Sequence, residues 1–482
     1  MAVILWLLLF ILLLCLRSRY GYGLHKFQGP LLASLTDFWR FYFAYHKNLF
    51  PMRELHERYG DVVRIGPNAL TFSNPQAVKD IFGAGKNWKK SDLYPVNAAV
   101  ARGKWAHTLF SSADQVWHRN VRRAMSVYFT QTSIESFEPL IDSTINVFLD
   151  ELDVRFATNN GKHGTKSVGA FRWLSYFAYD VMSGMTFSER YGFIQKGEDI
   201  QGIIGWVESF LAYGFVVGQM PWLDRLLRHN PLLMWFERQG LYGGNTFPGA
   251  NFALDRYGER ESKQMLEPVQ AEQEDLLDKF RKAKVERPEH ISYMEVLGLS
   301  LSTIIAGSEP TAIALTAVLY HVLRTPGCYG RLQTELDTAI LSGKSTDSSR
   351  NYSVPHSIAR NLPYLHACIQ ETFRVHPPFG ENMERIVPTP GADICGHYVP
   401  AGTVVGCNQG MIHRHKPTFG DDVDIFRPER WLETPENGDM IRKMERTMFQ
   451  FGAGNHLCLD LDGTPREAMG SAGLGDFEAS KF

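Results

Sequence analysis

The sequence has few cysteines, and they are widely scattered. There are six in 482 residues: Cys15, Cys328, Cys368, Cys395, Cys407 and Cys458. No two of them form a Cys-x-x-Cys pair, and this absence argues against a structural zinc site. So few cysteines in so long a chain also argue against a disulfide framework, and a reducing compartment is expected.

The sequence also lacks an excess of charge of either sign. Its 50 Lys and Arg against 52 Asp and Glu leave a net charge of −2 at pH 7. Because no basic field covers the chain, nucleic acid is not expected as a partner. We find neither an internal repeat nor a break in composition that would mark a second globular domain, and a chain of this length can bury a large core.

The N-terminus carries the clearest local signal. Apolar residues fill positions 2–16 without interruption, and Arg17 and Arg19 end the run. The run is short for a bilayer, which usually needs about 20 residues. No basic residue precedes it and no small-x-small cleavage site follows it, so a membrane anchor is favoured over a cleaved signal peptide. Positive charge after the run predicts a cytoplasmic remainder. We therefore expect one N-terminal anchor at 1–19 and a Gly- and Pro-containing linker at 20–35.

Helical periodicity dominates the rest of the chain. Helices are expected at about 114–129, 133–156, 170–186, 200–217, 251–282, 291–324 and 361–375. Strand patterns occur at about 62–72 and 384–407, whereas 83–112 and 342–353 have the composition of irregular segments. The predicted fold class is mainly α, with a small β region split between the two ends.

Two glycines and an aromatic residue stand just before the last cysteine. Phe451, Gly452 and Gly454 precede Cys458 by a few residues. Glycine lets the backbone turn tightly and approach a flat ligand closely. A thiolate at the end of such a loop suits a soft metal, above all haem iron. The alternative is a turn followed by a buried structural cysteine, and these residues alone leave both readings open.

An acid and a base three residues apart lie on one face of the helix expected at 361–375. Glu371 and Arg374 form such a pair, which usually marks a solvated surface. Here the helix is apolar and stops at Pro377, and buried charges need partners. Arg430, further along the chain, is a candidate third member of the network.

The longest expected helix contains small residues, an acid and a proline in close succession. Ala306 and Gly307 would let a ligand approach the backbone, and Pro310 removes a helical hydrogen bond and should kink the helix. Glu309 beside a freed carbonyl could bind water and relay protons, with Thr311 as a neighbouring hydroxyl. The alternative is a packing kink with an exposed acid.

Together, in this order and spacing, these elements resemble the cytochrome P450 family, and most closely its fungal microsomal members. They match its oxygen-activating helix, its Glu-x-x-Arg helix, its Pro-Glu-Arg segment and its cysteine loop. The resemblance implies the P450 fold, with a haem-thiolate catalytic domain at 36–458. It also implies the endoplasmic reticulum membrane as location, with a cytoplasmic catalytic domain.

The resemblance assigns roles residue by residue. Cys458 would be the axial thiolate ligand of haem iron, with Phe451 and Gly454 in its loop. Glu371, Arg374 and Arg430 would form the structural triad that supports this loop.

Further residues would bind the haem itself or act at the oxygen-activating helix. His118, Arg122 and Arg385 match contacts to the haem propionates, and His456 stands where the family usually has Arg. Ala306 and Gly307 would lie against the cofactor, and Glu309, Pro310 and Thr311 would be the catalytic positions.

The activity implied is that of a monooxygenase. It would insert one atom of O₂ into an apolar small molecule, of the kind found in secondary metabolism. Electrons would come from NADPH through a flavoprotein reductase. One departure supports an alternative, because Pro310 occupies the place of the oxygen-activating Thr. A relative that uses peroxide, or that rearranges its substrate, would need no reductase.

A second departure concerns residues 459–482. The family continues with Gly two residues after the cysteine, then a long helix and a β-hairpin. Here Asp460 replaces that Gly, and Pro465, Gly470 and Gly473 interrupt any helical stripe. We therefore expect the family's C-terminal helix and hairpin to be missing and the tail to be disordered. This predicts weak haem binding, so an inactive, haem-poor truncated member is a third reading.

Overall fold

The computed structural model describes most of the chain. The described residues are 2–47, 51–101, 103–157, 169–242, 248–264, 274–342 and 354–459. The expected tail beyond residue 459 lies outside them, as does all but the first residue of the polar loop expected at 342–353. The described structure is mainly helical with a small sheet region, which confirms the predicted fold class.

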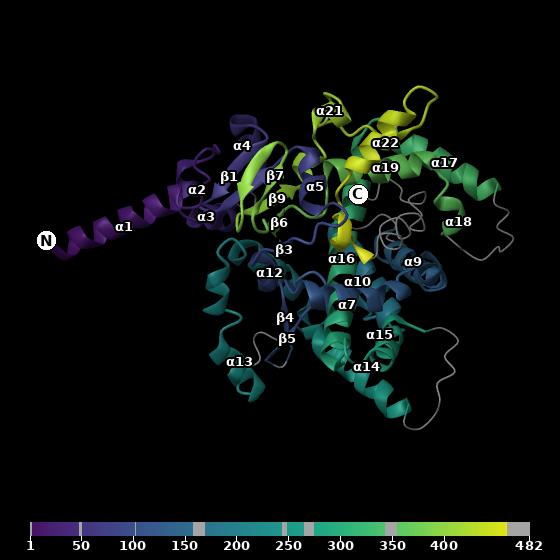
Figure 1. Ribbon diagram of the computed structural model, residues 1–482. Coiled ribbons are helices and arrows are strands. Elements are labelled where there is room, and N and C mark those ends of the chain that lie inside the picture. Colours follow the sequence, from purple (N-terminus) through teal and green to yellow (C-terminus); the bar gives the residue numbers. More distant parts are fainter. Residues whose placement is uncertain are drawn as a thin grey trace.

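The N-terminal helix α1 (Ala2–Tyr20) projects away from the body, with the N-terminus at its tip (Figure 1). Among the described residues, three helical stretches are long and apolar enough to cross a membrane. They are α1, Ile200–Val217, which consists of η3 (Ile200–Gly202) and α12 (Ile203–Val217), and α16 (Tyr293–Arg324). The apolar window of α1 has no buried residues, whereas two thirds of α16 is buried in the protein core. Of the three, α1 is therefore the helix free to serve as an anchor.

The last turn of α1 is fixed to the body by a buried arginine. Arg64 in β1 (Val62–Gly66) is fully buried and donates hydrogen bonds to the carbonyls of Ser18 at 2.8 Å and Arg19 at 2.9 Å. Burial, and then the charge of Arg19, lower the pKa of Arg64 to about 10. The carbonyls of Ser18 and Arg19, which follow the apolar run, are thus held by the body of the protein. The apolar run itself is not packed against it.

The main sheet joins strands from both ends of the chain. Its order is β1-β2-β9-β6-β3, with β2 (Ala69–Phe72), β9 (Val404–Asn408), β6 (Asn382–Ile386) and β3 (Lys89–Lys90). Only β2 and β9 are parallel, and β3 pairs with β6 so that Lys90 faces Arg385. Both expected strand regions are confirmed.

Two sequence-based expectations are wrong. Residues 83–112 are not wholly irregular, because they contain β3, α6 (Leu93–Val96), β4 (Ala99–Ala101) and β5 (Lys104–Ala106). The single helix expected at 251–282 is two helices, α14 (Pro248–Gln264) and α15 (Leu276–Glu286). The side chain of Asp275 accepts a hydrogen bond from the Asp278 amide, so it caps a new helix at that point.

The helical core is built around α16. This helix runs unbroken through Pro310 and packs along α10 (Ala170–Phe187). Around this pair lie α7 (Gln115–Met125), α9 (Glu138–Leu152), α17 (Cys328–Ser342) and α19 (Pro363–Val375). Helix α19 packs against α16, α17 and η5 (Pro428–Trp431), and it lies beside α22 (Gly438–Thr447) in Figure 1.

The attachment of the last turn of α1 predicts that two truncations within this helix will differ. Deleting residues 2–16 should release the protein from membranes at unchanged stability. Deleting 2–19 should cost about 1–3 kcal/mol more, because Arg64 then loses two acceptors. Flotation with vesicles and urea unfolding check the two parts. Equal stability of the two truncated forms would contradict the role given to Arg64.

Candidate functional site

The Glu371 carboxylate on α19 lies at the centre of a buried charge cluster. Arg374 donates to it twice, from Nε and Nη2, each at 2.8 Å. The Nε of Arg430 is 3.4 Å away, and both Glu371 and Arg374 are fully buried. The structure thus brings together the three residues expected to form a triad, within an interior where each charge needs compensation.

Further groups complete this cluster, and sequence reasoning missed them. The Trp431 indole donates to Glu371 at 2.8 Å, and the Arg427 amide does so at 2.9 Å. Arg374 also donates to the carbonyls of Val423 at 2.6 Å and Ile425 at 3.0 Å. The one available signal was Trp431, since a buried indole N–H requires an acceptor.

His413 joins this cluster to the cysteine loop. Its Nδ1 donates to the Phe373 carbonyl on α19 at 3.0 Å, and its Nε2 accepts from the Phe449 amide at 2.8 Å. Burial is the main cause that lowers its pKa to about 3, so the ring is neutral and holds this tautomer. The side-chain amide of Gln409 donates to the Phe449 carbonyl at 3.1 Å. Nothing in the local sequence around His413 indicated this role.

The loop itself depends on two glycines with positive φ. Gly452 has φ of +77° and Gly454 has φ of +60°. A Cβ at Gly454 would lie 2.0 Å from the Phe82 carbonyl oxygen, so only glycine fits there. The turn ends where the Cys458 amide donates to the Phe451 carbonyl at 2.9 Å, and the Cys458 side chain is exposed. The reading of Cys458 as a buried structural cysteine is therefore excluded.

Next to the thiol, the structure gathers two arginines and two histidines from three segments of the chain. His118 Nε2 lies 3.2 Å from His456 Nδ1, and Arg122 donates to the Leu457 carbonyl at 2.6 Å. Arg385 donates to the Tyr94 hydroxyl at 2.9 Å. All four residues expected to contact a dianionic cofactor thus enter one cluster.

Lys90 is a fifth member of this cluster that the sequence did not reveal. It faces Arg385 across the β3–β6 pairing, and it donates to the carbonyls of Leu109 and Phe110, each at 2.7 Å. Burial, and then Arg385, lower its pKa well below the usual value.

The electrostatics of the cluster favour an anion. Burial, and then the charges of Lys90, Arg122 and Arg385, lower the pKa of His118 to about 3 and that of His456 to about 2. Among the described residues, no carboxylate forms an ion pair with Lys90, Arg122 or Arg385. These basic side chains, beside the neutral rings of His118 and His456, therefore suit an acidic ligand.

The expected site residues of α16 lie on two faces of the helix, one exposed and one packed against α10. Ala306 and Pro310, four residues apart, are exposed on a helix that is otherwise largely buried. Gly307 instead faces α10, because a Cβ there would lie 2.5 Å from the Met182 methyl carbon. Glu309 also faces α10 and accepts a hydrogen bond from the Tyr179 hydroxyl at 3.0 Å.

The three expected catalytic residues therefore differ in exposure, because Pro310 is exposed whereas Glu309 and Thr311 are buried. Thr311 is buried like Glu309, and burial raises the pKa of the Glu309 carboxyl. Only Pro310 of this set is open to a ligand. Of the two small residues, Ala306 is open and Gly307 serves the packing of two helices.

Glu381 is an acid that sequence reasoning also missed. It stands between Phe379, whose ring centroid is 5.9 Å from that of Phe110, and the start of β6. Burial, and then the charge of Glu384, raise the pKa of Glu381 to about 7. Within the described part of the chain, no side chain donates a hydrogen bond to its carboxyl. At neutral pH it can therefore present either a proton donor or an acceptor.

These residues fit a haem. A thiol at the end of a glycine loop supplies one soft axial ligand. The cluster of Lys90, His118, Arg122, Arg385 and His456 supplies donors for two carboxylates, and Ala306 leaves room for a flat ring.

Comparison with known proteins agrees with this geometry. The family model for cytochrome P450 matches residues 30–459. A cytochrome P450 monooxygenase of Aspergillus terreus is 36% identical over 435 residues, which are 89% of this chain and 85% of that protein. One from Aspergillus flavus is 33% identical over 461 residues, or 93% and 86%. The cytochrome P450 monooxygenase mfmA of Annulohypoxylon moriforme is 34% identical over 450 residues, or 92% and 84%.

Replacing His413 should loosen the cysteine loop. His413→Ala leaves the Phe449 amide and the Phe373 carbonyl buried without partners, at a cost of about 1–3 kcal/mol. Between pH 3 and 6.5 the unfolded chain protonates His413 and the native state does not, so its contribution to stability falls as pH drops through that window.

Urea unfolding from pH 5 to 8 and the rate of haem loss to a scavenger measure this effect. His415, two residues further on, has a ring that hydrogen-bonds to the Thr418 hydroxyl at 2.9 Å. It is the matched control, and His415→Ala should change both quantities by much less. Equal effects of the two substitutions would refute the assignment.

Glu381 predicts a second pH dependence, of opposite sign. Between about pH 4.5 and 7 the native state holds a proton on Glu381 that the unfolded chain lacks, so stability falls as pH rises through this window. Glu381→Gln should therefore match the wild type at pH 4.5 and exceed its free energy of unfolding at pH 8, by up to about 3 kcal/mol. The exposed Glu436→Gln is the control, and a pH-independent difference for Glu381→Gln would be inconsistent with the raised pKa.

Proposed function

Because the chain belongs to the cytochrome P450 family, we propose that it is a haem-thiolate monooxygenase that takes electrons from NADPH through a flavoprotein reductase. It inserts one atom of O₂ into an apolar small molecule, and the other atom leaves as water. The observation that carries the proposal is the exposed Cys458 thiol beside the basic side chains of Lys90, Arg122 and Arg385, which form no ion pair with a carboxylate among the described residues.

Different residues are proposed to hold the iron and the propionates of the cofactor. Cys458 would ligate the haem iron, and Lys90, Arg122 and Arg385, with His118 and His456, would receive its two propionates. When bound, the haem supplies the oxygen chemistry, which a thiolate ligand promotes by pushing electron density toward the iron. The Arg122 guanidinium lies close enough to Cys458 for the thiol to influence its pKa, so it also favours the anionic sulfur.

Proton delivery is the step in which this chain departs from the family pattern. Pro310 offers no hydroxyl, and Glu309 is engaged by Tyr179 on α10. Water next to the exposed Pro310 is the remaining proton source that we propose.

The same observation favours one second function. A relative that accepts peroxide, or that rearranges its substrate, needs no delivery of protons to bound O₂, and the buried Glu309 and missing hydroxyl suit it. Comparing turnover with NADPH and reductase against turnover with peroxide separates the two. The third reading, a haem-poor protein, rests on residues 460–482, which lie outside the described structure.

The location proposed is the cytoplasmic face of the endoplasmic reticulum membrane. Helix α1 would anchor the chain. Exposed apolar side chains continue from it along α2 (Leu31–Leu35) and α3 (Phe38–Lys47), where Leu31, Leu32 and Phe38 point to solvent. This surface would rest on the bilayer and let apolar substrates, such as secondary metabolites, enter from the lipid.

An isotope experiment tests the function. With NADPH, a reductase and ¹⁸O₂, a panel of apolar small molecules should yield products that carry one labelled oxygen. Cys458→Ala should abolish the labelled product, and Cys458→Ser should be nearly as damaging, because an alcohol is a poor ligand for soft metals. Labelled product in normal amount from Cys458→Ala would refute the proposal. Turnover with peroxide alone would support the second function instead.

Charge near the cysteine side predicts how the reductase docks. Arg123 and Lys443 are exposed, whereas Arg442 is paired with Asp439 at 2.7 Å. Arg123→Glu with Lys443→Glu should slow reductase-driven reduction about tenfold or more at low salt, and less at high salt. Reduction by dithionite should be unchanged, and the exposed Lys196→Glu serves as control. Equal slowing of both reactions would indicate a folding defect.

A further inference from the structure

Two buried cysteines of different helices face each other behind the structural cluster. Cys328 is the first residue of α17, and Cys368 lies in α19, three residues before Glu371. Their sulfur atoms are 3.8 Å apart, and the side chains are 2% and 0% exposed. A disulfide needs about 2.05 Å between the sulfurs, so the two sulfur atoms would have to approach each other further to form a bond.

The surroundings give the two thiols unequal roles. Cys328 stands at the N-terminus of a 15-residue helix, where the helix dipole favours a thiolate. Hydrogen bonding to the Cys368 thiol, and also to the Tyr364 hydroxyl, lowers the pKa of Cys328. The same thiol contact, and then burial, raise the pKa of Cys368. Cys328 is thus the attacking sulfur and Cys368 the resolving one.

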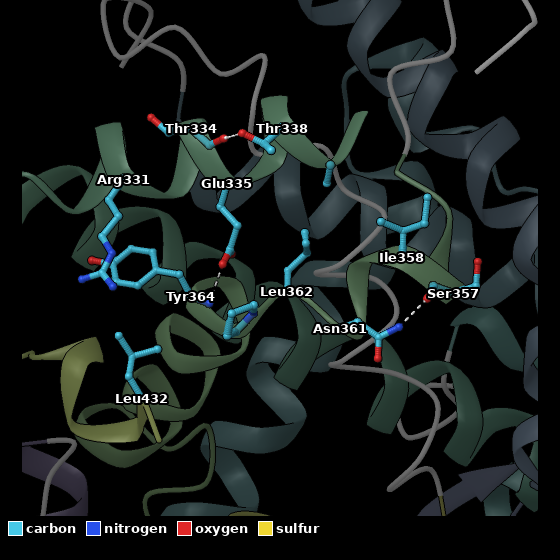
Figure 2. A pocket seen from close by; sticks show the side chains of 12 residues that line it. Arg331, Thr334, Glu335, Thr338, Ser357, Ile358, Asn361, Leu362, Tyr364 and Leu432 are labelled. Atoms are coloured by element: carbon cyan, nitrogen blue, oxygen red, sulfur yellow. Dashed lines mark hydrogen bonds between the residues drawn. The ribbon is translucent and has the colours of Figure 1, made fainter. Parts of the chain in front are cut away.

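A surface pocket of about 740 Å³ lies beside this pair, and its lining includes Tyr364 but neither cysteine. Figure 2 shows Arg331 lying on the Tyr364 ring, 4.2 Å from its centroid, at one end of the pocket. Glu335 of α17 accepts from the backbone amide of Tyr364 at 2.8 Å, so the two helices already touch here. The Tyr364 side chain therefore links the pocket to the thiol of Cys328.

We propose that Cys328 and Cys368 are a redox-active dithiol, which a cellular peroxide or disulfide converts into an intramolecular disulfide that clamps α17 to α19. With hydrogen peroxide, the Cys328 thiolate attacks one oxygen, the O–O bond breaks, and a sulfenic acid and hydroxide form. The Cys368 sulfur then displaces the hydroxyl group, which leaves with the thiol proton as water. Two thiols lose two electrons and two protons, and one peroxide becomes two waters. This device is independent of the monooxygenase reaction.

The test uses the full-length protein in glutathione buffers of graded redox potential, which oxidise by disulfide exchange. Thiols are then trapped by alkylation and the peptides are mapped by mass spectrometry. The expected product is a peptide pair joined through Cys328 and Cys368, and its yield should follow the buffer potential reversibly. Cys407 in β9 is the internal control. It is equally buried, burial raises its pKa, and it should be at least about tenfold less oxidised than the pair.

Two further measurements make the result decisive. Oxidation should raise the melting temperature by a few degrees, because the new bond closes a loop, and this shift should vanish in Cys368→Ser. In that variant Cys328 should carry glutathione instead of a link. If Cys328 and Cys368 stay as fully alkylatable as Cys407 in the most oxidising buffer, or each bonds only to glutathione, the proposal is wrong.

Discussion

The buried carboxylate of Glu371 is the constraint on which the rest of the site depends. Five donor groups from Arg374, Arg427, Arg430 and Trp431 converge on it. A buried charge is tolerated only when its partners are in place, so this carboxylate fixes α19 and the segment around Trp431 in one arrangement. Through His413 the same arrangement reaches the amide of Phe449, where the cysteine loop begins. The position of the Cys458 thiol therefore depends on the Glu371 carboxylate, although the two groups are not in direct contact.

The second constraint acts in the opposite sense. Around Glu371 every charge is compensated within the protein, whereas beside Cys458 the buried cations have no carboxylate partner among the described residues. Burial and mutual repulsion keep His118 and His456 neutral, with pKa values of about 3 and 2. An acidic ligand would relieve this repulsion, and its own charge would raise both values again. The charges around Glu371 are thus paired with one another. The basic side chains beside Cys458 are left for a ligand to neutralise.

The candidate residues that the sequence singled out occur in short local patterns. The glycines before Cys458 form one such pattern and the pair Glu371 and Arg374 another, and the structure brings the members of each together. Gly307 shows the limit of such patterns. It follows Ala306 directly, yet neighbours on a helix point about 100° apart, so it packs on Met182 while Ala306 stays open. Lys90 and His413 were missed because their partners lie hundreds or tens of residues away, across a strand pairing and a turn that no local pattern encodes.

The central claim is that this loop presents the Cys458 thiolate, rather than a neighbouring imidazole, to a haem iron. The most direct test is the absorption spectrum of the purified chain with saturating haem, reduced and bound to carbon monoxide. The account predicts the strongly red-shifted Soret band of a thiolate-ligated haem. His118 and His456 lie beside the loop and could compete as ligands, so an imidazole-type band without the red-shifted one would contradict the account.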